Sequence, residues 1–135
     1  MGGDERLRPR VLVVDDDDAI AELVREILGP EGYAVATAPN GADALELVRL
    51  HDPVLILVDL RMPVMDGRSF IDQYRRRGGH ARIFVFSAAG GAADALPMAG
   101  VDGAIAKPFD VDALLGAVAW ATGGVPRVRP PAETA

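Results

Sequence analysis

Several polar side chains directly follow short apolar runs in this sequence, and their types could together bind a metal ion and a phosphoryl group. Carboxylates held within ~4 to 6 Å of one another repel, so a cluster of them needs a cation. Mg²⁺ suits such a group because it takes oxygen ligands and completes its coordination shell with water and phosphate oxygens. The side chains that follow the apolar runs are Asp15, Asp16, Asp17 and Asp18 after the first, Asp59 after the third, Ser87 after the fourth and Lys107 after the fifth.

Lys107 is the lone lysine beside 13 arginines, which suits a compact ammonium that reaches into a small pocket. With the Ser87 hydroxyl it would complete the partners that a phosphoryl group needs. Taken singly, each residue has a plainer explanation: Asp18 as a helix cap, Asp59 as a solvated loop acid, and Lys107 as a surface lysine. Their joint position after different strands favours the functional interpretation.

The elements that must position these residues can be predicted from apolar periodicity. Continuous apolar runs predict strands buried on both faces, and apolar residues spaced at i, i+3, i+4 and i+7 predict helices. The predicted strands are residues 11–14, 32–37, 54–58, 83–86 and 104–106. The predicted helices are residues 20–28, 41–50, 67–77, a fourth that Pro97 interrupts, and a last one after Asp110 that buries Val111, Leu114, Leu115 and Val118.

Five repeats of strand then helix indicate an α/β doubly wound domain with a five-stranded parallel sheet. In such a sheet ligands bind outside the carboxyl ends of the strands, where the polar residues lie. We expect one domain over residues 10–121, a flexible N-terminus over residues 1–9 and a disordered tail over residues 122–135.

Composition narrows the class of protein. The chain has 135 residues, no cysteine and a net charge of −6, which argues against nucleic acid as a direct partner. No apolar run approaches the ~20 residues that cross a bilayer, and the first ten residues contain no secretory signal, so we expect a cytoplasmic protein without a membrane partner. Nucleotide-binding glycine motifs are also absent from the sequence.

Four segments resemble the response-regulator receiver domain of two-component signalling in order and spacing: residues 11–17, 57–67, 84–88 and 106–110. The resemblance implies a flavodoxin-like sheet of order 2-1-3-4-5 and a non-enzymatic signalling domain. A sensor histidine kinase or phosphotransfer protein would phosphorylate it, and an unknown downstream protein would then bind it. It further implies these roles: Asp59 as phosphoacceptor; Asp15, Asp16, Asp59 and the backbone carbonyl of Arg61 as Mg²⁺ ligands; Ser87, Lys107 and the backbone of Ala88 as phosphoryl contacts; and Ser87 with Ala104 as the switch region.

The chain departs from the family pattern at Ala104, where members usually carry Tyr or Phe. This departure favours one alternative, a receiver-like docking module that works without phosphorylation. A second alternative is a receiver fragment of a longer regulator. A third is a phosphatase of the haloacid-dehalogenase type, for which Asp15 and Asp17 have the required spacing but Ala19 does not fit the motif.

Overall fold

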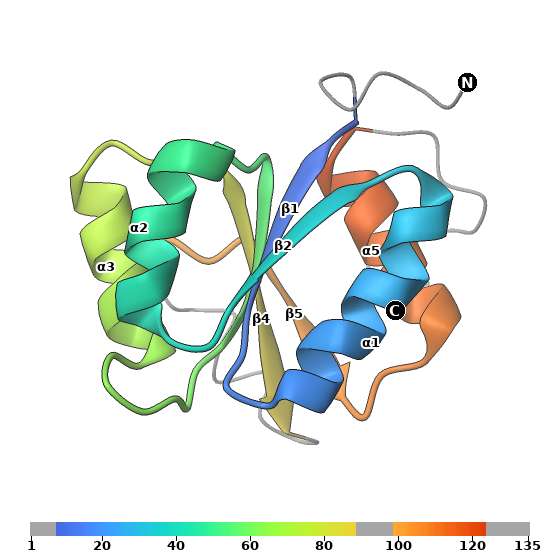
Figure 1. Ribbon diagram of the computed structural model, residues 1–135, viewed down its shortest axis with the longest axis horizontal. Helices are drawn as coiled ribbons and strands as arrows, with labels where there is room; N and C mark the ends of the chain where they lie inside the picture. Colours follow the sequence, from blue (N-terminus) through green and yellow to red (C-terminus); the bar gives the residue numbers. More distant parts are fainter. Residues whose placement is uncertain (1–7, 89–98, 124–135) are drawn as a thin grey trace.

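The computed structural model describes residues 8–88 and 99–123, without the side chains of residues 87 and 88. Strands and helices alternate along the chain (Figure 1). The strands are β1 (Arg10–Val14), β2 (Ala34–Ala38), β3 (Leu55–Asp59), β4 (Arg82–Ala88) and β5 (Gly103–Lys107). The helices are α1 (Asp18–Leu28), α2 (Gly41–His51), α3 (Gly67–Arg76) and α5 (Val111–Ala121), with a 3₁₀ turn, η2 (Gly29–Glu31), after α1.

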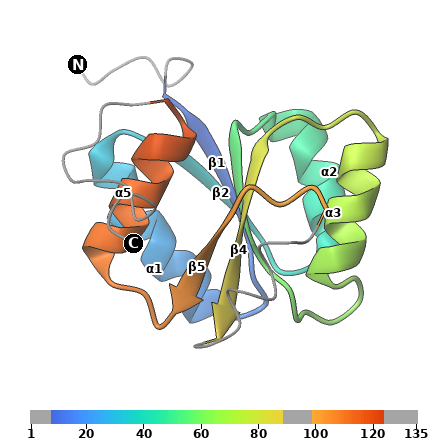
Figure 2. The ribbon, with the colours of Figure 1, turned by 180° about the vertical axis from the view of Figure 1, so that it is seen from behind.

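The strands form one parallel sheet of order β2-β1-β3-β4-β5, which confirms the predicted topology. Helices α1 and α5 cover one face of the sheet, and α2 and α3 cover the other, as Figures 1 and 2 show from opposite sides. Because all strands run the same way, their carboxyl ends meet along one edge of the sheet. The polar residues that follow β1, β3 and β5 are thereby brought to that edge.

Strand β1 explains why the sheet needs helices on both sides. Its residues alternate between two hydrophobic clusters, with Val11 and Val13 on the α1 and α5 side and Leu12 and Val14 on the α2 and α3 side. All four side chains are fully buried. Burying a Val or Leu contributes ~1.5–3 kcal/mol, so exposing either face would remove much of the stability of the domain.

Each helix starts at a capping side chain that accepts backbone N–H groups of its first turn. Asp17 accepts from Ala19 and Ile20 at the start of α1. The other caps are Asn40 for α2, Asp66 for α3 and Asp110 for α5. The caps of α1 and α3 lie close in the chain to the site acids, because Asp17 is two residues after Asp15 and Asp66 is seven residues after Asp59. The starts of these two helices are therefore fixed near the carboxyl edge of the sheet.

Several predicted boundaries differ from the observed ones. Val54 precedes β3 and Val111 begins α5 as an exposed residue, with side chains 45% and 49% exposed, so the predicted burial of Val111 is wrong. Helix α1 ends at Leu28 as predicted, but the left-handed glycine is Gly32, after the 3₁₀ turn. The predicted fourth helix with Pro97 lies outside the described residues, as do residues 1–7 and 124–135 of the predicted flexible ends.

No helix within residues 8–88 and 99–123 has both the length and the apolar character needed to cross a membrane.

Candidate functional site

Asp15 and Asp59 lie side by side because they follow paired positions of neighbouring strands. Val14 of β1 pairs with Val58 of β3, so the next residue of each strand emerges at the same edge of the sheet. Asp16 follows Asp15 there. Carboxylate oxygens of Asp15, Asp16 and Asp59 all lie within 4.8 Å of one another. With Lys107, described next, these residues form what we call the acidic site.

Lys107 reaches the acids from the edge strand β5. Its Nζ donates to Asp15 Oδ2 at 2.8 Å and to Asp59 Oδ2 at 3.5 Å. The ammonium also lies 5.4 Å from the centre of the Phe86 ring, which favours a cation over its face. Partial burial lowers the pKa of Lys107, but the hydrogen bond and charge of Asp15, together with Asp59, outweigh burial and raise it. Lys107 is therefore held in its charged form.

Asp15 is the most buried of the acids, at 1% exposure. Its Oδ1 accepts the Asp17 backbone N–H at 2.9 Å, and its Oδ2 accepts Lys107. Burial raises the pKa of Asp15 more than these two bonds lower it, and the nearby charge of Asp59 raises it further. The site thus contains a carboxylate whose charge is costly and which a second cation would stabilise.

Asp59 is partly open to solvent, with its side chain 20% exposed. Its Oδ1 accepts the backbone N–H of Arg61 at 3.2 Å, which leaves Oδ2 toward Lys107. Gly67 packs directly against the end of β3. Its N–H donates to Leu60 O at 3.1 Å. A Cβ on Gly67 would collide with Asp59 O and lie 2.8 Å from Leu60 Cα, so the close approach requires glycine. An accessible carboxylate oxygen is therefore presented beside one fixed ammonium.

The residues present fit a hard divalent cation. Three carboxylates and one ammonium carry a formal charge of −2, and the donors that converge are all oxygens, as Mg²⁺ prefers. The partly exposed Asp59 leaves room for water or a phosphate oxygen to complete the shell. The same arrangement can hold a phosphoryl group on Asp59 next to Lys107.

The other predicted site residues fall into three groups. Asp17 is used as the α1 cap and Asp18 is an exposed residue of its first turn, so neither joins the cluster. Ser87 and Ala88 end β4, where Ala88 pairs with Lys107, and their side chains lie outside the described residues. Ala104 pairs with Val85 and is half-buried against the α2 and α3 cluster.

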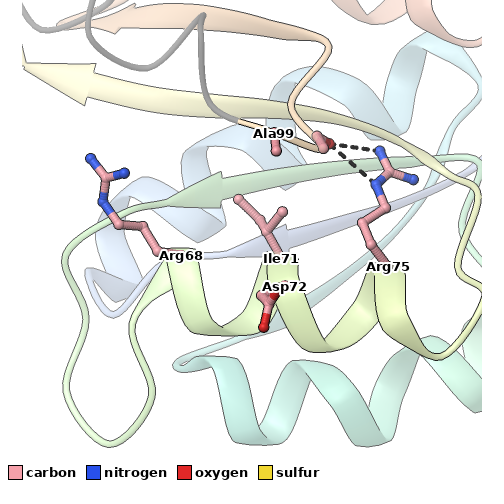
Figure 3. Close-up of a pocket in the computed structure, with 6 residues that line it drawn as sticks. Arg68, Ile71, Asp72, Arg75 and Ala99 are labelled. Carbon is pink, nitrogen blue, oxygen red and sulfur yellow. Dashed lines mark hydrogen bonds between the residues drawn. The ribbon is translucent and has the colours of Figure 1, made fainter.

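Arg75 lies in the last turn of α3, where favourable interaction with the helix dipole is by itself enough to explain a basic residue. In the structure Arg75 donates to Gly79 O, Ala81 O and Gly100 O and to the Asp102 carboxylate, at 2.8–3.2 Å. Figure 3 shows its guanidinium bonded to the turn before β5, beside a cleft lined by Arg68, Ile71, Asp72 and Ala99. Nothing in the local sequence signals these bonds, because the acceptors are mostly backbone carbonyls.

Comparison with known proteins places this geometry in context. Residues 11–119 match the family model of the response regulator receiver domain. The chain is 37% identical over 113 residues to the chemotaxis protein CheY of Bacillus subtilis (strain 168), covering 81% of this chain and 93% of that protein. It is 36% identical over 108 residues to the response regulator MprA of Mycobacterium sp. (strain KMS), covering 78% of this chain but 47% of that protein.

Solved structures agree in fold. The receiver domain of NtrX from Brucella abortus superposes with a TM-score of 0.77 at 28% identity, covering 85% of this chain and 99% of that chain. The chemotaxis response regulator CheY4 of Vibrio cholerae gives a TM-score of 0.78 at 28% identity, covering 84% and 98%.

Proposed function

Because the chain belongs to the response regulator receiver family, we propose that it accepts a phosphoryl group on Asp59 and thereby changes its affinity for a protein partner. The observation that carries the proposal is the placement of an accessible Asp59 carboxylate 3.5 Å from the Lys107 ammonium and beside two further acids. The donor is a phosphohistidine on a sensor kinase or phosphotransfer protein. The domain acts on itself and is not an enzyme for a separate substrate.

The transfer is a single displacement at phosphorus. A carboxylate oxygen of Asp59 attacks as the P–N bond of the donor breaks, and the electron pair of that bond stays on the imidazole nitrogen. Oδ1 is held by the Arg61 N–H, so the carboxylate is oriented before the donor arrives. Lys107 has three N–H donors and already reaches Asp15 Oδ2 and, at 3.5 Å, Asp59 Oδ2, so its ammonium is close enough to Asp59 to contact oxygens of a phosphoryl group formed there.

Asp15, Asp16 and Asp59 would hold Mg²⁺, with the backbone carbonyl of Arg61 as a further ligand. A cation held by these residues would supply positive charge that offsets the charge on the phosphoryl oxygens. Asp15 supplies part of the negative charge that attracts the ion, and its bond to Lys107 keeps the ammonium near the same position. The backbone of Ala88 and the Ser87 hydroxyl would contact the remaining phosphoryl oxygens.

Incubation with acetyl phosphate and Mg²⁺, followed by intact mass measurement, tests the proposal. We expect one phosphoryl adduct that hydroxylamine removes and that Asp59→Asn lacks. Asp18→Asn is the matched control, because Asp18 is an exposed aspartate near the site but outside the cluster. Retention of the adduct in Asp59→Asn would refute the assignment, and turnover of a generic phosphomonoester would favour the phosphatase alternative.

Ala104 favours a second candidate function, the docking module that does not need phosphate. A methyl group at this half-buried position provides no ring that could change its packing. Amide hydrogen exchange with and without beryllium fluoride separates the two functions. Slower exchange of residues 87–98 with the mimic supports the phosphorylation switch, whereas equal exchange supports the docking module.

The receiver chemistry is the same for a stand-alone domain and for one part of a longer regulator. The matched region spans nearly all of the Bacillus CheY but about half of MprA. A relative of about the length of the domain and a longer relative are therefore both known. We propose the stand-alone form, with the longer regulator as the alternative.

A further inference from the structure

Strand β5 carries Lys107 to the acidic site, but its own side chains do little to fix its position along β4. In the sheet that the structure describes, β5 is an edge strand with β4 as its neighbour. Its sequence is Gly-Ala-Ile-Ala-Lys, so Ile105 is its one large buried side chain. Such strands specify their register weakly, and a slip by two residues would keep the same faces while moving Lys107 by about 6.6 Å. The ammonium, now 2.8 Å from Asp15 Oδ2, would then lose this contact.

Asp102 joins the residue before β5 to the start of β4. Its N–H donates to Ile83 O at 2.7 Å, and its Oδ2 accepts the Ile83 N–H at 2.8 Å. Both polar backbone groups of Ile83 are therefore bonded to one residue of the other segment. A slip of β5 along β4 would separate Asp102 from Ile83 and break both bonds, so these bonds favour the observed register.

Arg75 of α3 holds Asp102 in this position. Its Nη2 donates to the same Asp102 Oδ2 at 3.2 Å and to Gly100 O at 2.8 Å. Its Nη1 donates to Ala81 O, just before β4, at 2.8 Å. Because a guanidinium is planar and its donors have fixed directions, these bonds hold the segments before β4 and before β5 in one relative position.

The ring of Phe84 excludes the slipped registers. Phe84 pairs with Gly103, and a Cβ on Gly103 would lie 2.9 Å from Phe84 Cζ, closer than Cβ atoms approach other atoms in proteins. A slip by two residues in either direction would bring Val101 or Ile105 to this position, and each of these carries a Cβ. The observed register is therefore favoured by the bonds of Asp102 and protected by the glycine opposite Phe84.

The ion pair between Lys107 and Asp15 does not make these contacts redundant. In the proposed function Asp15 also binds Mg²⁺ and Lys107 also contacts the phosphoryl group, so their mutual bond is one that the reaction changes. The contacts of Arg75 and Asp102 lie at the opposite end of β5 and involve no group that takes part in the reaction. They can therefore fix the strand while the contacts of Lys107 change.

We propose that Arg75 and Asp102 are positioning residues for phosphoryl transfer. By fixing the register of β5 against β4, they place the Lys107 ammonium beside Asp59. Neither residue touches the donor or the metal ligands, and both act through the five residues of β5. The inference rests on the proposed function, because the position of Lys107 affects transfer only if Asp59 accepts the phosphoryl group.

The lone lysine of the chain makes its own position measurable. Isotopically labelled lysine gives a single side-chain methylene signal in the NMR spectrum. The ring of Phe86 displaces this signal from that of free lysine, since Nζ lies 5.4 Å from the ring centre. Arg75→Gln and Asp102→Ala remove the bonds that favour the register, and Gly103→Ala places a Cβ against the Phe84 ring.

Two matched controls separate position from general effects. Arg76→Gln removes the neighbouring arginine of α3, whose ion pair with Asp72 is exposed. Val35→Ala lowers stability at the opposite edge of the sheet, because Val35 is a half-buried residue of β2. All spectra are recorded at neutral pH without Mg²⁺, under conditions in which urea unfolding shows each protein to be folded.

We expect the three variants at Arg75, Asp102 and Gly103 to move the Lys107 signal toward that of free lysine, and both controls to leave it unchanged. Labelling by saturating acetyl phosphate should slow by about tenfold in Arg75→Gln and Asp102→Ala, since a misplacement of 1 Å can cost ~100-fold in rate. The Mg²⁺ concentration that gives half-maximal labelling should not rise, because the acidic ligands follow β1 and β3 and not β5.

An unchanged Lys107 signal in both Arg75→Gln and Asp102→Ala would overturn the inference, even if labelling slowed. An equal shift in Val35→Ala would also overturn it, since the signal would then follow stability and not register. A shifted signal with a wild-type labelling rate would refute the role in transfer. If acetyl phosphate fails to label the wild type, the proposed function is refuted, whereas the NMR signal still decides whether Arg75 and Asp102 place Lys107.

Discussion

Replacing Lys107 with methionine should leave Asp15 buried without its cation. The methionine side chain keeps the length of the stem over Phe86, so the change removes mainly the charge. In the wild type the Lys107 and Asp15 side chains are 24% and 0% exposed and their charged atoms lie 2.8 Å apart. Breaking such a pair by removing one partner typically costs ~3–5 kcal/mol, because the remaining charge loses its compensation.

Protonation of Asp15 sets an upper limit on the unfolding free energy that Lys107→Met can lose. Neutralising a carboxyl group whose unfolded pKa is ~3.9 costs about 4 kcal/mol at pH 7. Burial already raises the pKa of Asp15 in the wild type, so part of this cost is present before the substitution. We therefore expect Lys107→Met to lower the free energy of unfolding by about 3 kcal/mol at pH 7 in the presence of a chelator.

The sign of the pH dependence follows from linkage. Loss of Lys107 raises the folded pKa of Asp15 further, so the folded variant binds a proton that the unfolded chain binds only at lower pH. The difference between wild type and variant should then shrink as pH falls from 7 to 5, by up to ~1.4 kcal/mol per pH unit. At pH 7, Mg²⁺ should reduce the difference in unfolding free energy between wild type and Lys107→Met, because it supplies positive charge beside Asp15.

Urea unfolding at pH 7, 6 and 5 with chelator, and at pH 7 with Mg²⁺, measures these differences. Arg76→Met is the control, because the Arg76 pair with Asp72 is exposed and should contribute little at any of these pH values. A loss in Lys107→Met that stays constant between pH 7 and pH 5 would show that packing, and not the charge of Asp15, accounts for the effect.

Two further predictions concern other charges of the domain. Asp16→Asn should raise the thermal midpoint in chelator, because it relieves repulsion with Asp15 and Asp59, and should reduce the shift that Mg²⁺ produces; a lower midpoint with an unchanged Mg²⁺ shift would exclude a role in metal binding. Burial lowers the pKa of His51 from 6.5 more than its bond to Val11 O raises it, with Arg10 adding to the lowering and Asp52 opposing it. The unfolded chain therefore binds the proton first as pH falls below 6.5, and wild type should lose more unfolding free energy than His51→Gln between pH 7.5 and pH 5.5; parallel pH profiles of the two proteins would contradict this.

Periodicity and end-of-strand chemistry were enough to predict a parallel sheet and the meeting of Asp15, Asp16, Asp59 and Lys107 at its carboxyl edge, whereas the strand order 2-1-3-4-5 was implied by the resemblance to the receiver family. Both depend on local patterns: apolar runs mark buried strands, and parallel strands bring their carboxyl ends together. The role of Arg75 was not predictable in this way. The acceptors of Arg75 are supplied by chain segments that come together only in the fold.

The bonds that close the loop of residues 60–66 have a consequence for the kinetics of encounter. The Gly67 N–H donates to Leu60 O and the Gly41 N–H donates to Met65 O, and both hydrogen bonds are already formed in the chain without a partner. A partner that touches this loop therefore loses little conformational entropy in ordering it, and more of the contact energy remains as affinity. Association can then proceed at the ~10⁵–10⁷ M⁻¹s⁻¹ set by orientation, without waiting for a rearrangement of the loop.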